Sequence, residues 1–141
     1  MNNRWMDTYP RPRKLSGVHM AGYAYDVHRF VLMHYNDDYE SLTTLAHEWG
    51  HAMHSYLSNR SQPFVTANYA TFVAEIASTF NEALLLGRML KKVNNDDERL
   101  FYLGNALENL HGTFLLQAMF AEFEGKIHAA VDAGNRLPAT S

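Results

Sequence analysis

The sequence of 141 residues contains no cysteine, which excludes a disulfide scaffold and thiolate metal ligands. No stretch approaches the roughly 18 consecutive apolar residues of a membrane-spanning helix, and the first residues lack the apolar segment of a signal peptide. Positive charge is not in excess either, because 12 Lys and Arg against 15 Asp and Glu give a net charge of −3. We therefore expect neither a membrane span nor a nucleic-acid-binding surface.

Apolar residues are abundant enough for one folded domain. They make up 47 % of the chain against 19 % charged residues, a balance that excludes intrinsic disorder. The length also predicts a single domain. Histidine stands out, with eight copies against 12 Lys and Arg together.

Residue patterning predicts a mainly α chain with a short β hairpin before its first helix. Residues 1–17 are expected to be irregular, and a strand within 18–25 is expected to pair with a strand at 30–35. Apolar residues spaced by three and four predict a helix that starts near Ser41 and ends between Ser58 and Pro63. The same spacing predicts a second helix over residues 69–92.

A third helix is predicted from about Glu98 to Asp132. Asp96 or Asp97 is the expected N-cap, because a short carboxylate side chain can accept a hydrogen bond from the first free backbone N–H groups. So long a helix is expected to break near Gly112 or Gly125.

One motif carries recognisable chemistry: His47 and His51 enclose Glu48 in the pattern His-Glu-x-x-His. Two histidines four residues apart on a helix project from one face, so both can bind the same Zn²⁺. Glu48 follows the first histidine directly and can take a proton from water beside the metal. The alternative is that the motif is a chance match on a helix, so the surrounding residues must decide between the two interpretations.

A catalytic zinc site needs three protein ligands and one open position. In one class of such sites the third ligand is a histidine six positions after the second, but this chain has Leu57 there and His54 where that class has glycine. The remaining candidate is Glu75, on the next predicted helix and flanked by small residues. Antiparallel packing of the two helices would bring Glu75 toward the histidine face.

Three further residues lie where they could support these ligands. His54 shares the face of His47 and His51, although a packing role is the simpler interpretation. Glu82 lies seven positions after Glu75 on the same helix face, where it could orient a ligand histidine through its second ring nitrogen. Ser78, on the same predicted helix, could likewise support one of the ligands.

Longer runs around the motif extend the pattern over nearly the whole chain: FVLMHYN at 30–36, TLAHEWGHAMHS at 44–55, SQP at 61–63, FVAEIASTFNEAL at 72–84, GTF at 112–114 and MFAEFE at 119–124. Together they resemble the oligoendopeptidase F branch of the thimet-oligopeptidase-like zinc metallopeptidases. The resemblance implies a zincin-like metallopeptidase core with one Zn²⁺ per chain. It implies His47, His51 and Glu75 as zinc ligands and Glu48 as the general base. Members of the family cut short peptides, mostly in the cytoplasm.

The resemblance also implies a substrate-binding strand, which would offer its edge to an extended peptide. That strand comprises Phe30, Val31, Leu32, Met33, His34 and Tyr35. Arg29 stands where the family usually has proline, and His34 where it usually has asparagine.

The family's later segment, with a Tyr and a His that support the tetrahedral intermediate, has no counterpart up to Ser141. We therefore expect residues 1–141 to be part of a longer catalytic domain. Apolar helix faces that would pack on absent segments are expected to favour self-association. The Phe and Met residues of 114–123 are expected to lie in the core.

Two rival hypotheses come from other classes of protein. A di-iron carboxylate bundle would use Glu48 with His51 and Glu108 with His111, because both pairs fit Glu-x-x-His, with Glu75, Glu82 or Glu122 completing the set. A catalytically incomplete helical fragment would instead hold zinc for structural reasons. Metal content separates the first rival from a one-zinc peptidase, and a peptidase assay separates the second.

Overall fold

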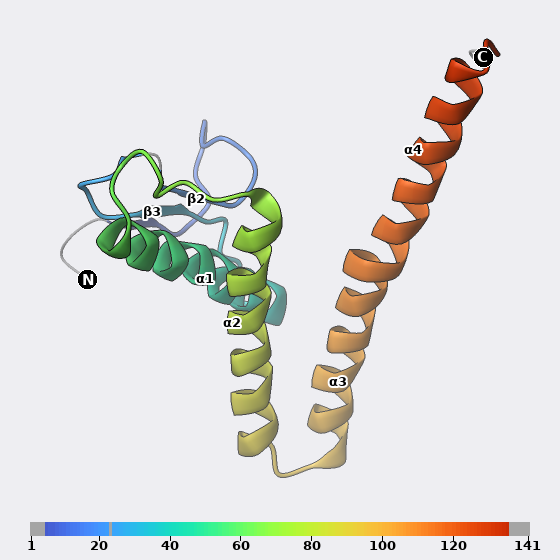
Figure 1. The fold of residues 1–141 in the computed structure, drawn as a ribbon. Helices are drawn as coiled ribbons and strands as arrows, with labels where there is room; N and C mark the ends of the chain where they lie inside the picture. Colours follow the sequence, from blue (N-terminus) through green and yellow to red (C-terminus); the bar gives the residue numbers. More distant parts are fainter. Residues whose placement is uncertain (1–4, 23, 136–141) are drawn as a thin grey trace. The chain divides into compact units, whose positions relative to one another are not determined.

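The computed structural model describes residues 5–22 and 24–135, and it is mainly helical with one small sheet, as predicted (Figure 1). The chain divides into two compact units, residues 1–91 and 92–141. Within the described part, no helix is both long and apolar enough to cross a membrane. The partial catalytic domain expected over residues 1–141 stays a prediction.

The sheet of the first unit has three strands, β1 (Met6–Asp7), β2 (His19–Ala21) and β3 (Phe30–Leu32), in the order β1-β3-β2. Strands β2 and β3 pair antiparallel, which confirms the predicted hairpin. Strand β1 pairs parallel with β3, although it lies within the segment predicted to be irregular. A two-residue strand is too short to show the alternation on which such a prediction depends.

Strand β3 is therefore the middle strand of the sheet, with a partner on each side. Beyond β3, the backbone N–H groups of Met33 and Tyr35 donate to the carbonyl oxygens of Asp7 (2.9 Å) and Thr8 (3.0 Å). The prediction that Phe30–Tyr35 offers a free edge is wrong for Phe30–Leu32, because strands on both sides already use its backbone hydrogen-bonding groups.

Two helices complete the first unit, α1 (Tyr39–Ser61) and α2 (Thr71–Lys92). Helix α1 starts after Asp38, whose carboxylate accepts a hydrogen bond from the backbone N–H of Ser41 at 2.7 Å. Hydrogen bonds from Ser41 lower the pKa of Asp38. The helix ends at Ser61, shortly before Pro63, which confirms the predicted end.

The apolar core lies between the sheet and α1, and it is small. Val31, Met33 and Ala52 are its fully buried members, and partly buried side chains such as Leu45 and Trp49 pack against them. Three further apolar residues of α1 are about half exposed: Met53, Tyr56 and Leu57. Helix α1 thus buries mostly small and polar residues: Ser41, Glu48, Gly50, Ala52 and Ser55.

Arg29 fixes the loop between β2 and β3 onto α1. Its side chain is almost fully buried, and its guanidinium donates to the carbonyl oxygens of Ala24 (2.7 Å) and Val27 (2.9 Å) in the loop. A third bond reaches the carbonyl oxygen of Ser55 in α1 at 3.1 Å. The arginine therefore has a structural role of its own, because proline at this position could make none of these bonds.

Helices α1 and α2 are in close backbone contact at Gly50. A Cβ atom at this position would lie 2.6 Å from the Cα of Ser78 and 2.7 Å from the carbonyl oxygen of Ala77. These are backbone atoms, so no side-chain rotation could relieve the overlap. Near this contact, the Asn81 side-chain amide donates to the carbonyl oxygen of Ala46 at 2.5 Å. Glycine at position 50 thus sets how closely the two helices approach.

The second unit contains α3 (Asp96–Leu110), a π-helical segment (His111–Leu115) and α4 (Leu116–Asp132). The π-helical segment interrupts the long predicted helix at Gly112, as expected, whereas Gly125 lies inside α4. The predicted N-cap, Asp96 or Asp97, is wrong. Asn95 is the cap, and its side chain accepts a hydrogen bond from the backbone N–H of Glu98 at 2.8 Å.

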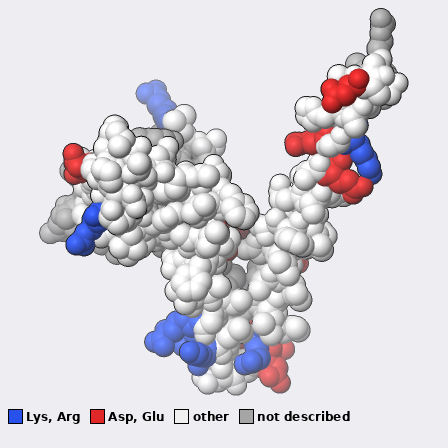
Figure 2. All heavy atoms as spheres, viewed as in Figure 1, with Lys and Arg blue, Asp and Glu red and all other residues white. Residues whose placement is uncertain are grey.

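The second unit buries none of the residues of its helical segments. The prediction that the Phe and Met residues of 114–123 lie in the core is wrong, because they are between 46 % and 64 % exposed: Phe114, Met119, Phe120 and Phe123. Figure 2 shows that much of the visible surface carries neither Lys, Arg, Asp nor Glu. A helical unit without a buried core fits the expected self-association, which stays a prediction.

Gly50→Ala should lower the free energy of unfolding by about 1–3 kcal/mol, because the added methyl group overpacks a backbone contact. Alanine is the better helix former by about 1 kcal/mol, so propensity alone predicts the opposite sign. Gly87→Ala in α2 is the matched control, since a Cβ atom added there would have nothing within 4 Å. Urea denaturation of both variants measures the difference. Equal stability of the two would contradict the close contact at Gly50.

Candidate metal centre

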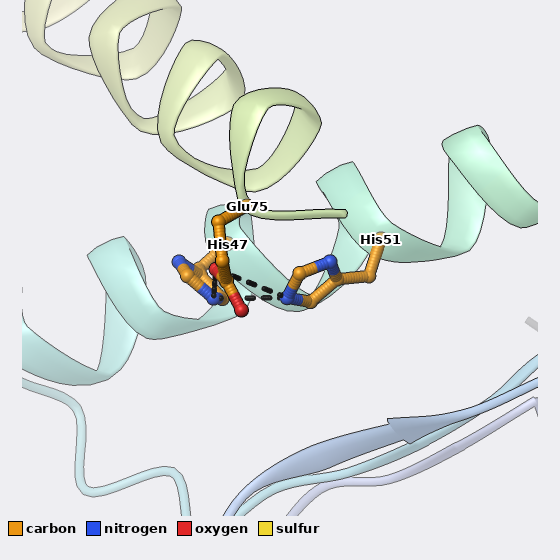
Figure 3. Close-up of side chains that lie close together, drawn as sticks. All are labelled: His47, His51 and Glu75. Atoms are coloured by element: carbon orange, nitrogen blue, oxygen red, sulfur yellow. Dashed lines mark hydrogen bonds and ion pairs between the residues drawn. The ribbon is translucent and has the colours of Figure 1, made fainter. Parts of the chain in front are cut away.

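His47 and His51 on α1 and Glu75 on α2 point toward one another (Figure 3). The two Nε2 atoms of the histidines lie 3.0 Å apart. Oε2 of Glu75 lies 3.3 Å from Nε2 of His47 and 3.6 Å from Nε2 of His51. Among residues 5–22 and 24–135, these three form the one group of His, Asp and Glu residues that could hold a metal ion.

The spacing of these three atoms fits a tetrahedral ion. Bonds of about 2.0 to 2.1 Å at tetrahedral angles set neighbouring ligand atoms about 3.3 Å apart. The three observed separations of 3.0, 3.3 and 3.6 Å bracket this value. Two imidazoles and one carboxylate are also a ligand set typical of catalytic zinc, with a fourth position left for water or substrate. The donor set therefore fits zinc in both chemistry and spacing.

Glu82 holds His47 from the far side of its ring. The Nδ1 atom of His47 lies 2.5 Å from Oε1 of Glu82. A carboxylate only accepts hydrogen bonds, so Nδ1 carries a proton. When the ring is neutral, this leaves the lone pair on Nε2, the atom that faces His51 and Glu75. The hydrogen bond to Glu82 raises the pKa of His47, against the effect of burial, and the charges of Glu82, Glu75 and Glu48 add to the rise. This arrangement is typical of a metal-binding histidine.

Glu48 is buried in α1, with 7 % of its surface exposed. It is not one of the three clustered residues, which suits a base rather than a ligand. Its charge acts on His47, whose pKa it helps to raise, so the carboxylate lies within electrostatic reach of the cluster. The role predicted for Glu48 stays a prediction.

The other two residues expected near the ligands differ in where they lie. Ser78 is fully buried, and its Oγ lies 2.9 Å from Oε2 of Glu75. His54 instead stacks on Tyr69, with ring centroids 3.9 Å apart, and burial lowers its pKa. Its Nδ1 is buried and has no hydrogen-bond partner among the described residues. His54 thus packs between α1 and the segment before α2, as the simpler interpretation predicted.

Asn81 is the contributor that the sequence did not single out. Its amide bonds the Ala46 carbonyl, directly before His47, and so ties α2 to the helix that carries both histidines. An asparagine on a helix carries no signal of such a contact, because the partner is a backbone atom on another element.

The residues needed for a di-iron bundle are divided between the two units, with Glu48 and His51 in the first. Glu108 and His111 are exposed and belong to the second unit. No group of three metal-binding side chains within the described ranges includes either of them. The structure therefore gives that hypothesis no support.

Comparison with known proteins gives a match to the model of peptidase family M3 over residues 1–140. Oligopeptidase PepF of Bacillus subtilis is 42 % identical over 137 residues, which cover 97 % of this chain and 20 % of the relative. The plasmid-encoded oligoendopeptidase F of Lactococcus lactis subsp. cremoris is 43 % identical over 134 residues, covering 95 % of this chain and 22 % of the relative. The chain thus spans about a fifth of the length of these relatives.

A solved structure shares the fold. The crystal structure of a proposed peptidase from Chlamydophila abortus superposes with a TM-score of 0.79 at 42 % sequence identity. The match covers 92 % of this chain and 22 % of that one. Most of this chain therefore corresponds to a part of a much longer chain.

Proposed function

The chain belongs to peptidase family M3, and from this premise we propose that His47, His51 and Glu75 hold the zinc ion of an endopeptidase that hydrolyses short peptides. The observation that carries the proposal is the triangle of donor atoms with sides of 3.0, 3.3 and 3.6 Å. Relatives named oligoendopeptidase F support the substrate class. The cytoplasmic location that the resemblance implies stays a prediction.

The proposed reaction is the attack of water on a peptide carbonyl. Zinc supplies a Lewis acid that polarises the carbonyl group and makes water more acidic. Glu48 takes the proton of the attacking water and later passes it to the leaving amine. Glu82 keeps the proton of His47 on Nδ1, so that Nε2 stays available as a ligand.

The path of the peptide substrate is limited by the sheet. Because β3 is the middle strand, its backbone cannot add a peptide strand at Phe30–Leu32. Among the residues that the structure describes, β1 and β2 are the outer strands of this sheet. Any pairing of substrate with this sheet would therefore use one of them.

Glu48→Gln should keep the bound metal and lower kcat by at least about 10²-fold, because an amide cannot accept the proton of water. Metal content by mass spectrometry and hydrolysis of a quenched fluorescent peptide check the two halves of this expectation. Glu40→Gln is the control, since Glu40 is an exposed carboxylate in the first turn of the same helix. Near wild-type turnover by Glu48→Gln would exclude Glu48 as the base. A chain that binds zinc and hydrolyses nothing would favour the catalytically incomplete fragment.

The two carboxylates of α2 should differ in their effect on zinc affinity. Glu75→Ala removes a ligand, so we expect loss of tight binding. Glu82→Ala removes only a partner of His47, which typically costs about 10- to 100-fold. Zinc titration against a chromophoric chelator measures both. A larger loss in Glu82→Ala than in Glu75→Ala would overturn the ligand assignment.

A further inference from the structure

Glu75 is the least confined of the three proposed ligands. Its side chain is 49 % exposed, against 26 % for His47 and 14 % for His51. A glutamate side chain has several rotatable bonds, and an exposed one samples many rotamers. His47 is held by Glu82, but Glu75 lies in the second turn of α2 and faces solvent on one side. Some contact must hold its carboxylate toward the histidines.

Ser78 makes that contact from a position that water does not reach. It has no exposed surface, and it lies where Gly50 of α1 is in close backbone contact with α2. Its Oγ donates to Oε2 of Glu75 at 2.9 Å, the same oxygen that faces both Nε2 atoms. A carboxylate oxygen has two lone pairs, so one can accept the hydroxyl proton while the other remains for a metal ion.

We propose that Ser78 is a positioning residue of the metal centre, whose hydroxyl holds the Glu75 carboxylate toward His47 and His51. This inference rests on the proposed metal site and deepens it. Without the hydroxyl, the carboxylate would rotate into solvent and would have to be reordered each time a metal ion binds.

The Ser78 hydroxyl could instead serve only the helix backbone, and Thr79 provides the control for that interpretation. Serine and threonine hydroxyls in helices often bond a carbonyl oxygen of the preceding turn. The Ser78 Oγ also lies 3.1 Å from the Glu75 carbonyl oxygen. The Thr79 hydroxyl donates to this same carbonyl oxygen at 2.6 Å, from an exposed position. Thr79→Ala therefore removes a hydroxyl that bonds only backbone oxygens. Ser78→Ala removes a hydroxyl that bonds the same backbone oxygen and also the Glu75 carboxylate.

The test compares zinc affinities of the 141-residue chain and its variants by chelator competition. We expect Ser78→Ala to weaken binding about 10- to 100-fold, as loss of a ligand's hydrogen-bond partner typically does. Thr79→Ala should stay within about threefold of wild type. The visible spectrum of the Co²⁺-substituted chain should change in Ser78→Ala and remain unchanged in Thr79→Ala.

A double-mutant cycle with Glu75→Ala distinguishes positioning from a general structural effect. If Ser78 acts through Glu75, Ser78→Ala should cause no further loss of zinc affinity once Glu75 is alanine. An equal loss in both backgrounds, or a Ser78→Ala affinity matching that of Thr79→Ala, would overturn the inference. Wild-type chain that binds no zinc at all would overturn the metal site itself, and with it the role of Ser78.

Discussion

The close approach of α1 and α2 at Gly50 is the constraint on which the metal centre depends. The Gly50 backbone meets the backbone of Ala77 and Ser78, and a single methyl group would separate them. The centre lies across this contact, with both histidines on one helix and Glu75 on the other. Because the ligand atoms are only 3.0–3.6 Å apart, a shift of α2 by one carbon–carbon bond length would remove the fit.

Polar contacts, rather than a large apolar core, hold this helix pair together. Asn81 bonds the Ala46 carbonyl and Glu82 bonds His47. Ser58 of α1 also donates to the carbonyl oxygen of Ala67, in the segment that leads to α2, at 2.7 Å. Apolar residues of α2 such as Phe72 and Phe80 are exposed. A hydrogen bond constrains the direction of both partners, so these polar contacts define the register of the two helices. A pair of helices joined in this way can hold charged and polar groups in register around a metal ion.

The first unit also explains the departure from the family pattern at Arg29. Its buried guanidinium bonds the loop 24–27 and α1, and proline could form none of these bonds. The hairpin is thus held against the helix that carries the histidines. Pairing with β1 completes the sheet and places β3 in its middle.

The sequence by itself determined the local features of this protein. The spacing of His47 and His51 depends only on helix periodicity, and the ends of α1 follow from local residue preferences. The same preferences predicted a break at Gly112 or Gly125, and the structure places it at Gly112. Only the tertiary structure decided which strand lies in the middle of the sheet and which apolar helix faces stay exposed. It also decided which candidate supporting residue contacts a proposed ligand: Ser78 bonds Glu75, whereas His54 stacks on Tyr69. The physical reason is that these outcomes depend on contacts between elements distant in sequence, and neither periodicity nor spacing within one element encodes such contacts.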